Sequence, residues 1–179
     1  MIRQPKPINK PDRQAKFHIK KGKKFVVKEL FREISQEAKK FFKNTTNISI
    51  LDIGTACGEL VYFLKKDLGS GGEIWGIDLD PQFIKCAKER FGDSGINFVV
   101  GDALNFNLMK KFDLVCVTSV FSYFEDPRPA FGNLVRHLKP SGMAMVTGLF
   151  NDYGFEVVSK YRKAGSGKWL TGFNQYPIS

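Results

Sequence analysis

The chain has 179 residues, a hydrophobic content of 42% and a formal net charge of +10, which fits one globular domain with a sizeable core. No apolar run approaches the roughly 18 residues needed to cross a bilayer, and the first 14 residues lack the apolar segment of a signal peptide. Composition therefore argues against a membrane-spanning or secreted protein, and we expect a cytoplasmic one.

The cysteines and histidines do not form a metal-site pattern. Cys57, Cys86 and Cys116 are widely spaced, form no C-x-x-C pair, and are accompanied by only two histidines. We therefore expect no metal, and we interpret Cys57 and Cys116 as small packing residues.

The excess positive charge lies in residues 1–43, which hold 14 Lys and Arg against 4 Asp and Glu, whereas residues 44–179 hold 14 of each. The cluster Lys20–Lys24 (KKGKK) could bind an anionic acceptor such as a nucleic acid, a phosphorylated sugar or an acidic glycan. We favour the alternative of a flexible, Pro-containing basic leader over residues 1–24, followed by a solvated helix face.

The stretch Phe25–Phe42 has the periodicity of an amphipathic helix. Lys28, Arg32, Lys39 and Lys43 lie mostly away from its apolar face. That face is predicted to hold Val27, Leu30, Phe31, Ile34, Ala38, Phe41 and Phe42.

The next stretch, Ile48–Gly58 (ISILDIGTACG), is an apolar run that turns through a loop with Gly54 and Gly58. A second apolar run ends at Asp78 within Gly76–Pro81 (GIDLDP). Strand, glycine loop, helix, strand and acid, in that order, indicate a nucleotide-type ligand across the carboxyl ends of a parallel sheet.

A dinucleotide such as NAD is disfavoured, because Ala56 and Glu59 stand where the second and third glycines of G-x-G-x-x-G belong. A simpler alternative is that Gly54 and Gly58 only make a tight turn between a strand and a helix.

Three more apolar runs come later in the chain, Ile96–Val100, Phe112–Val120 and Met143–Phe150, the last preceded by an expected turn at Leu138–Gly142 (LKPSG). These runs alternate with helical stretches such as Pro81–Phe91, as a parallel α/β sheet covered on both faces requires.

Together these features resemble the class I S-adenosylmethionine-dependent methyltransferases, over roughly Ser49 to Phe150. The D-x-G-x-G-x-G motif of that family is matched by Asp52, Gly54, Ala56 and Gly58, with alanine in place of one glycine. The resemblance implies a Rossmann-like α/β fold with a mostly parallel twisted sheet flanked by helices. It also implies S-adenosylmethionine as cofactor and S-adenosylhomocysteine as product.

The resemblance implies roles for the glycine loop. Asp52 would hold the loop or bind the cofactor amino group through water. Gly54 and Gly58 would let the backbone approach the methionine part, and Thr55 and Ala56 complete the same cofactor-binding loop.

It implies further cofactor contacts at the later strands. Asp78 would accept hydrogen bonds from the ribose hydroxyls, and Leu79 would lie against the adenine. Asp102 would accept from the adenine amino group, the Ala103 amide would contact a ring nitrogen, and Ser119 would offer its carbonyl to the methionine ammonium.

Two of these acids have simpler explanations. Asp102 could be a turn residue after Gly101, and Asp78 could cap the helix that begins at Pro81. Asp80 suits the capping role better, because Pro81 then occupies the first helical position.

The acceptor side is expected in Val120–Pro127 (VFSYFEDP), where many small-molecule relatives read V-L-E-H-x-x-D-P. Ser122 and Tyr123 replace the Glu-His pair, so Tyr123 is the one catalytic candidate, although we favour it as an aromatic wall of the pocket. Methyl transfer needs alignment, and a base only when the acceptor carries a proton. The Asn/Asp-Pro-Pro-Tyr/Phe motif of many nucleic-acid and protein amino-group methyltransferases is absent.

The end of the chain, residues 151–179, is expected to form a hairpin of Gly154–Arg162 and Trp169–Tyr176 that could cap the acceptor site. It resembles segments of sugar and cell-surface glycan methyltransferases. Because the family sheet normally has seven strands, we expect a C-terminally truncated form of a longer methyltransferase. The expected organisation is a leader over 1–24, a cofactor-binding core over 25–150, and this cap.

The leading hypothesis is methyl transfer to a small-molecule or sugar-type acceptor. One alternative is an RNA or DNA methyltransferase that uses the basic N-terminal segment. Another is a cofactor-binding domain without catalysis.

Overall fold

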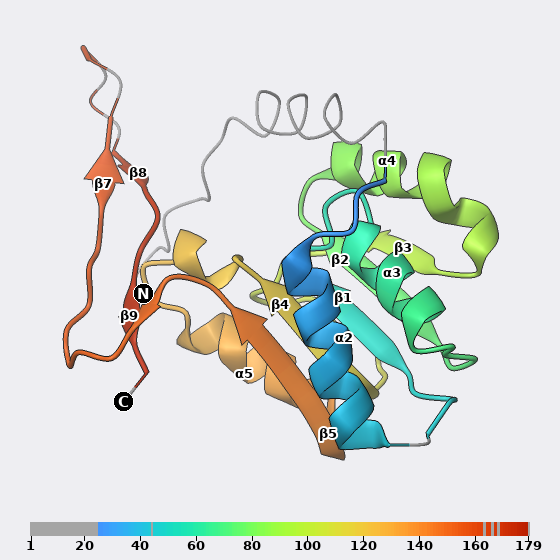
Figure 1. Cartoon of the computed structure of the whole chain (residues 1–179). Helices are drawn as coiled ribbons and strands as arrows, with labels where there is room; N and C mark the ends of the chain where they lie inside the picture. Colours follow the sequence, from blue (N-terminus) through green and yellow to red (C-terminus); the bar gives the residue numbers. More distant parts are fainter. Residues whose placement is uncertain (1–24, 44, 163, 166, 168, 179) are drawn as a thin grey trace.

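The computed structural model describes residues 25–43, 45–162, 164–165, 167 and 169–178 (Figure 1). The basic leader, including Lys20–Lys24, lies outside the described residues. The described elements are, in chain order, α2 (Glu29–Phe42), β1 (Ile50–Ile53), α3 (Glu59–Asp67), β2 (Ile74–Asp78), α4 (Pro81–Phe91), η1 (Gly92–Ser94), β3 (Asn97–Val100), β4 (Phe112–Thr118), η2 (Phe121–Tyr123), α5 (Arg128–Arg136), β5 (Leu138–Thr147), β6 (Phe150–Asn151), β7 (Lys160–Tyr161), β8 (Leu170–Thr171) and β9 (Tyr176–Pro177).

Five strands form one parallel sheet in the order β3-β2-β1-β4-β5, which confirms the predicted fold class. The chain builds β1, β2 and β3 outward in one direction, and then returns to place β4 on the other side of β1. A crevice opens beside the central strand at such a reversal, at the carboxyl ends of the strands. The glycine loop leaves β1 at this edge.

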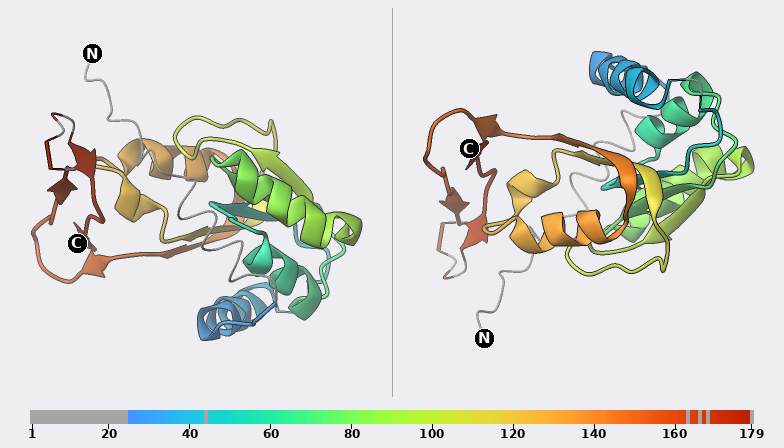
Figure 2. Two further views of the ribbon diagram at one scale, coloured as in Figure 1. Left: turned by 90° about the horizontal axis from the view of Figure 1, so that it is seen from above. Right: turned by 90° about the horizontal axis from the view of Figure 1, so that it is seen from below.

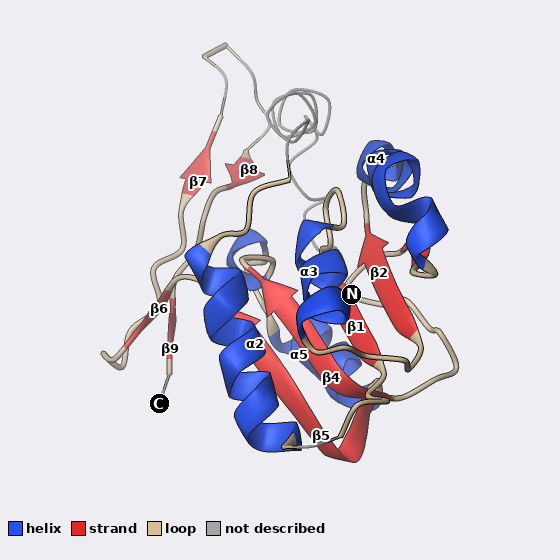
Figure 3. Ribbon diagram, turned by 45° about the vertical axis from the view of Figure 1, so that its right-hand side comes forward, coloured by secondary structure: helices blue, strands red, loops and turns tan. Residues whose placement is uncertain are grey.

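Helices cover both faces of the sheet, as Figure 3 shows. Neighbouring strand residues alternate between the two faces, so Ile50 packs in the cluster that includes α2, α3 and α4, whereas Leu51 packs with α5. Both side chains are fully buried, which explains why the strands read as continuous apolar runs rather than alternating ones. None of the described helices is long and apolar enough to cross a membrane.

The predicted amphipathic helix forms as α2, but it begins at Glu29 rather than at Phe25. Phe31, Ile34 and Ala38 are buried as expected. The placement of Phe41 on the buried face was wrong, because its side chain is 51% exposed in the last turn.

The expected turn at Leu138–Gly142 lies within β5, but the pairing with β4 is irregular there. Phe112 pairs with Leu138 and Leu114 with Met143, so a longer stretch of β5 lies opposite a shorter stretch of β4. The extra residues bulge out of the ladder, where Pro140 does not have to donate a ladder hydrogen bond.

The C-terminal hairpin is confirmed, with a shorter ladder than the sequence suggested. Strand β7 pairs antiparallel with β8, and Val157 forms an antiparallel bridge with Gln175. Strands β6 and β9 form a separate parallel pair. Figure 2 shows this segment standing off one side of the five-stranded sheet.

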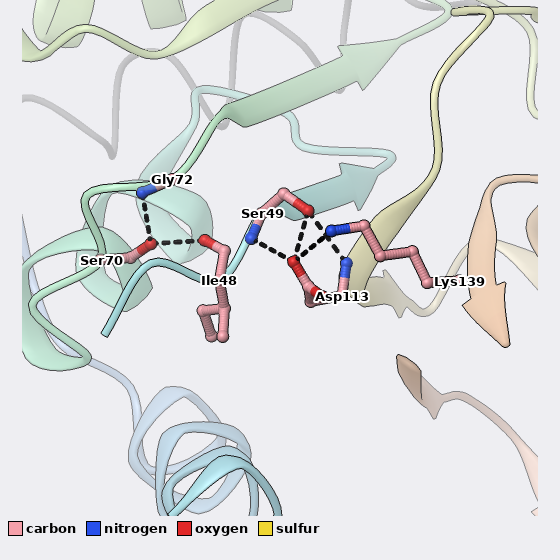
Figure 4. A network of polar contacts seen from close by, with 6 residues as sticks. All are labelled: Ile48, Ser49, Ser70, Gly72, Asp113 and Lys139. Atoms are coloured by element: carbon pink, nitrogen blue, oxygen red, sulfur yellow. Dashed lines mark hydrogen bonds and ion pairs between the residues drawn. The ribbon is translucent and has the colours of Figure 1, made fainter. Parts of the chain in front are cut away.

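A polar network joins the strands at their amino ends, the end of the sheet opposite the glycine loop (Figure 4). The Asp113 carboxylate accepts hydrogen bonds from the Ser49 amide at 2.8 Å and the Ser49 hydroxyl at 2.7 Å, and Lys139 donates to it at 2.8 Å. Burial alone would raise the pKa of Asp113, but the bonds from Lys139 and Ser49 outweigh it and hold the pKa below its ordinary value. The network thus links β4 to the start of β1 and to β5.

We expect Asp113→Asn to lower the free energy of unfolding by about 1–2 kcal/mol at pH 7, because the amide loses the ion pair and part of the acceptor set. A depressed carboxyl pKa stabilises the fold above the unfolded value of about 4, and this contribution is lost as pH falls through the folded pKa. Urea unfolding at pH 7 and pH 3 should therefore show the deficit shrinking in acid. The exposed Asp152→Asn is the control, and an equal deficit at both pH values would contradict the account.

Candidate functional site

The loop from β1 to α3 turns through three left-handed residues: Gly54 at φ 79°, Ala56 at φ 47° and Gly58 at φ 80°. A Cβ at Gly54 would lie 2.2 Å from a Val120 methyl carbon, so glycine is required there by space as well as by conformation. Ala56 adopts a conformation that costs a residue with a Cβ roughly 1–2 kcal/mol.

The Asp78 carboxylate holds this loop. One oxygen accepts from the Ala56 amide at 2.9 Å, and the other accepts from the Asp80 amide at 2.9 Å. Burial raises the pKa of Asp78, although the hydrogen bonds from the Asp80 and Ala56 backbones oppose the shift. Asp80 in turn caps α4, accepting from the Gln82 amide at 2.8 Å with Pro81 at the first helical position, as predicted.

Asp52 lies beneath the loop at the centre of the sheet edge. Its side chain is 2% exposed, and burial raises its pKa to about 7; Thr55 lowers the pKa and the charge of Asp78 raises it further. The site thus holds a buried carboxyl that lacks a cationic partner among the described residues. Such a group favours a positively charged ligand.

The glycine loop forms one wall of a cavity, and the loop after β3 forms a second wall. Asp102 accepts from the Leu104 amide at 2.9 Å, so the turn role is observed, and Asp102 also faces the cavity. The Asn133 side-chain amide donates to the Ala103 carbonyl at 3.1 Å and ties this wall to α5.

The segment after β4 forms the third wall. Ser119 has a φ of 60°, and its amide donates to the Thr147 carbonyl at 2.7 Å. Tyr123 lines the cavity, with its ring centroid 4.6 Å from that of Phe173 in the C-terminal segment. Burial raises the pKa of Tyr123, and Asp78 and Tyr161 add to the shift.

Hydrogen bonds fasten the C-terminal segment to the segment after β4. The Asn174 amide donates to the Ser122 carbonyl at 2.8 Å, and both the Asn174 side chain and the Tyr176 hydroxyl donate to the Phe124 carbonyl. The Glu125 carboxylate accepts from the Thr171 hydroxyl at 3.0 Å and pairs with Lys160 at 3.2 Å. These contacts hold β7 and β8 next to the third wall.

The three walls enclose a cavity of about 730 Å³, which is in the range of small-molecule sites. The structure brings together ten of the eleven residues singled out in the sequence, and Gly58 is the exception. A Cβ at Gly58 would meet the Phe98 ring at 2.8 Å, so its role is close packing at the start of α3. The ten that line the cavity are Asp52, Gly54, Thr55, Ala56, Asp78, Leu79, Asp102, Ala103, Ser119 and Tyr123.

Comparison with known proteins decides the family. A family model described as a methyltransferase domain matches residues 51–146, more than half of the chain. The chain belongs to this methyltransferase domain family.

Individual relatives match only part of their length. A malonyl-[acyl-carrier protein] O-methyltransferase of Acetivibrio thermocellus is 33% identical over 98 residues, which make up 55% of this chain and 34% of that protein. The plantazolicin methyltransferase BpumL has a TM-score of 0.64 at 24% identity over 79% of this chain and 54% of that one. The amino pentose methyltransferase CalS10 of Micromonospora echinaspora has a TM-score of 0.61 at 19% identity over 86% and 64%. The chain thus spans about a third of the curated relative's length, and the two structures support the fold.

Sequence reasoning missed several cavity residues of this methyltransferase domain. Helical periodicity predicted that Lys28 points away from the packed face. The sequence pattern also did not indicate that side chains of α4 line the cavity. The missed lining residues include Lys28, Phe31, Cys57, Phe83, Arg90 and Phe124.

We expect Ala56→Gly to raise the free energy of unfolding by about 0.5–1 kcal/mol, because glycine relieves the left-handed strain. In a domain of this size that corresponds to a rise of about 1–4 °C in Tm, measurable by calorimetry. Ala130→Gly, at a buried position in α5, should have the opposite sign, because glycine is a poor helix former and removes a packed methyl group. A lower Tm for Ala56→Gly would contradict the strain at this position.

Proposed function

We propose that this methyltransferase domain binds S-adenosylmethionine and transfers its methyl group to a small-molecule acceptor, releasing S-adenosylhomocysteine. The observation that carries the proposal is the convergence of Asp52, Asp78 and Asp102 on one cavity. They lie at or within two residues of the carboxyl ends of three neighbouring parallel strands, beside a glycine loop that matches the family motif.

The residues present fit this cofactor. Asp80 Oδ2 and Thr118 Oγ1 are buried at the cavity and have no hydrogen-bond partner among the described residues. S-adenosylmethionine carries a sulfonium and an ammonium, and the raised pKa of Asp52 reflects a carboxyl that a cation would stabilise in its charged form. The orphan oxygens and the acidic lining therefore suit a polar, cationic ligand.

Each carboxylate has acceptor capacity left for a ligand. A carboxylate offers about four lone-pair sites, and the backbone bonds to Asp78 use two of them. The free sites of Asp78 would accept from the ribose hydroxyls, Asp102 from the adenine amino group, and Leu79 would pack against the adenine. The left-handed loop at Gly54 keeps side chains away from the methionine part.

The bound cofactor supplies an already activated methyl group, which transfers by in-line displacement. The chain's own residues then contribute chiefly by alignment and exclusion of water. Tyr123 forms an aromatic wall at the acceptor side, because its ring packs 4.6 Å from that of Phe173. Burial raises the pKa of its phenol, which further disfavours the phenolate that would act as a base.

A small acceptor, such as a sugar, is supported by the segment over the third wall. Tyr123 and Phe173 present adjoining rings, and Tyr161 lies near enough to Tyr123 to influence its titration. Aromatic faces with polar edges suit a compact ligand that has both apolar and hydroxyl surface. CalS10, which has the same fold, is an amino pentose methyltransferase.

We place the domain in the cytoplasm, in keeping with the unpaired Cys57, Cys86 and Cys116.

We expect the chain to bind S-adenosylhomocysteine in calorimetric titration, and Asp78→Asn to weaken binding about 10- to 100-fold, because charge-assisted bonds contribute roughly 1.5–3 kcal/mol each. Asp93→Asn, at an exposed residue outside the cavity, is the matched control. Thermal unfolding of Asp78→Asn checks that the loop it holds has not collapsed. No binding by the unmodified chain, or unchanged affinity in a folded Asp78→Asn, would refute the cofactor site.

For any acceptor that a product screen identifies, Tyr123→Phe should keep kcat within about threefold, whereas Tyr123→Ala should raise KM tenfold or more, because it removes the packed ring. Phe131→Ala, which removes an exposed ring on α5 outside the cavity, is the control for Tyr123→Ala. Loss of kcat by two orders of magnitude in Tyr123→Phe would show that the hydroxyl acts as a base instead.

A further inference from the structure

Two of the three cysteines lie close together beside the glycine loop. Cys57 directly precedes Gly58, the N-cap of α3, and Cys86 lies in α4; both thiols are buried and unpaired. The two segments are in close contact, because a Cβ at Gly58 would lie 3.2 Å from the Cβ of Ala87. The Cys86 thiol also influences the titration of the Cys57 thiol as a hydrogen-bond partner, so the two side chains are neighbours. Segments this close satisfy the first requirement of a disulfide, whose Cβ atoms lie roughly 3.5–4.5 Å apart.

The third cysteine is placed differently. Cys116 lies within β4, in register with Asp52 of β1, and is fully buried in the core. Cys57 is one of the residues that line the cavity, whereas Cys86 and Cys116 are not. A small reagent that enters the cavity therefore meets Cys57 first, and Cys86 is the thiol next to it.

The surroundings of Cys57 make its thiol slow to react. Burial raises the pKa of Cys57, the Cys86 thiol adds to the shift, and the charge of Arg90 opposes it. The thiolate is the reactive form, so Cys57 is a poor target for a bulky reagent. A small peroxide can reach it through the cavity, and the neighbouring thiol can capture the first oxidation product before it is oxidised further.

We propose that Cys57 and Cys86 are a site of reversible oxidation, at which a small peroxide converts the two thiols into a disulfide. The Cys57 sulfur attacks one oxygen of hydrogen peroxide, the O–O bond breaks, and a sulfenic acid and a water form. The Cys86 sulfur then displaces the hydroxyl group of the sulfenic acid, which leaves with the thiol proton as a second water. The two thiols thus give up two electrons and two protons, and one peroxide becomes two waters.

The disulfide acts on the glycine loop. Its two sulfur atoms lie about 2.05 Å apart, closer than unbonded sulfur atoms approach, so the bond draws Cys57 and Cys86 together. Cys57 directly follows Ala56, which is left-handed and whose amide donates to the Asp78 carboxylate at 2.9 Å. We therefore expect the oxidised chain to bind S-adenosylhomocysteine more weakly. This effect on binding rests on the proposed function, whereas formation of the disulfide does not.

The test treats the folded chain with hydrogen peroxide, blocks the remaining thiols with iodoacetamide, and maps the peptides by mass spectrometry without reduction. Cys86→Ala removes the second thiol of the pair. Cys116→Ala is the matched control, because it removes a buried thiol outside the pair. Thermal unfolding shows whether each variant remains folded.

We expect the unmodified chain and Cys116→Ala to give a peptide that links Cys57 to Cys86, with the mass of the two thiol hydrogens lost. Cys86→Ala should give no disulfide. In calorimetric titration the oxidised chain should bind S-adenosylhomocysteine about tenfold more weakly, and dithiothreitol should restore the affinity. In a glutathione redox buffer, saturating S-adenosylhomocysteine should shift the equilibrium toward the thiols by the same factor, because the coupling is reciprocal.

Three outcomes would overturn the inference. If Cys57 and Cys86 both remain open to iodoacetamide after peroxide treatment and unfolding, the two thiols only pack in the fold. A disulfide from Cys57 to Cys116, or to a second chain, would refute the pairing. A disulfide between Cys57 and Cys86 that leaves the affinity unchanged would refute its action on the loop. Failure of the reduced chain to bind S-adenosylhomocysteine would instead refute the proposed function, and the peptide map would still decide whether the disulfide forms.

Discussion

The site depends on the two hydrogen bonds that the Asp78 carboxylate accepts from the Ala56 and Asp80 amides. Where parallel strands end, the ladder no longer fixes the chain, and each crossover loop must be held by other contacts. Asp78 is the last residue of β2. It accepts one hydrogen bond from the loop after β1 and one from the loop after β2, so a single side chain sets the relative position of the two loops. The bond to the Ala56 amide also helps to offset the left-handed conformation of a residue that is not glycine.

Much of the fold could be predicted from the sequence, because its determinants are local. Buried parallel strands read as short β-branched runs, and the glycine loop after Asp52 marks the strand that lies at the centre of the sheet. Asp80 with Pro81 directly after it fixed the start of α4 to the residue. The cofactor candidates could also be placed, since carboxyl ends of parallel strands share one edge and bring Asp78 and Asp102 to one cavity.

The features that the sequence did not reveal depend on packing between distant segments. Helical periodicity assigned Phe41 to the apolar face, but the last turn of α2 leaves this ring half exposed. The same pattern turned Lys28 away from the fold, whereas the anchor of Phe25 on α3 and α4 brings it to the cavity rim. Gly58 fits the family motif, yet one reason for glycine there is the Phe98 ring, which comes much later in the chain and would collide with a Cβ.

On the proposed function, the end of β4 is where the cofactor side and the acceptor side of the cavity meet. Ser119 is held to β5 through the Thr147 carbonyl, and the chain then continues through Val120, which touches the glycine loop at Gly54. A few residues later the carbonyl of Phe124 and the carboxylate of Glu125 hold the C-terminal segment. On the proposed function, the cofactor side is built mainly from the ends of β1 to β3 together with Ser119, and the acceptor side from the segments that follow Ser119. On the proposed function, substitutions in the C-terminal segment can change the acceptor wall while the loop that Asp78 holds stays in place, because this segment is hydrogen-bonded to Ser122, Phe124 and Glu125, which follow β4.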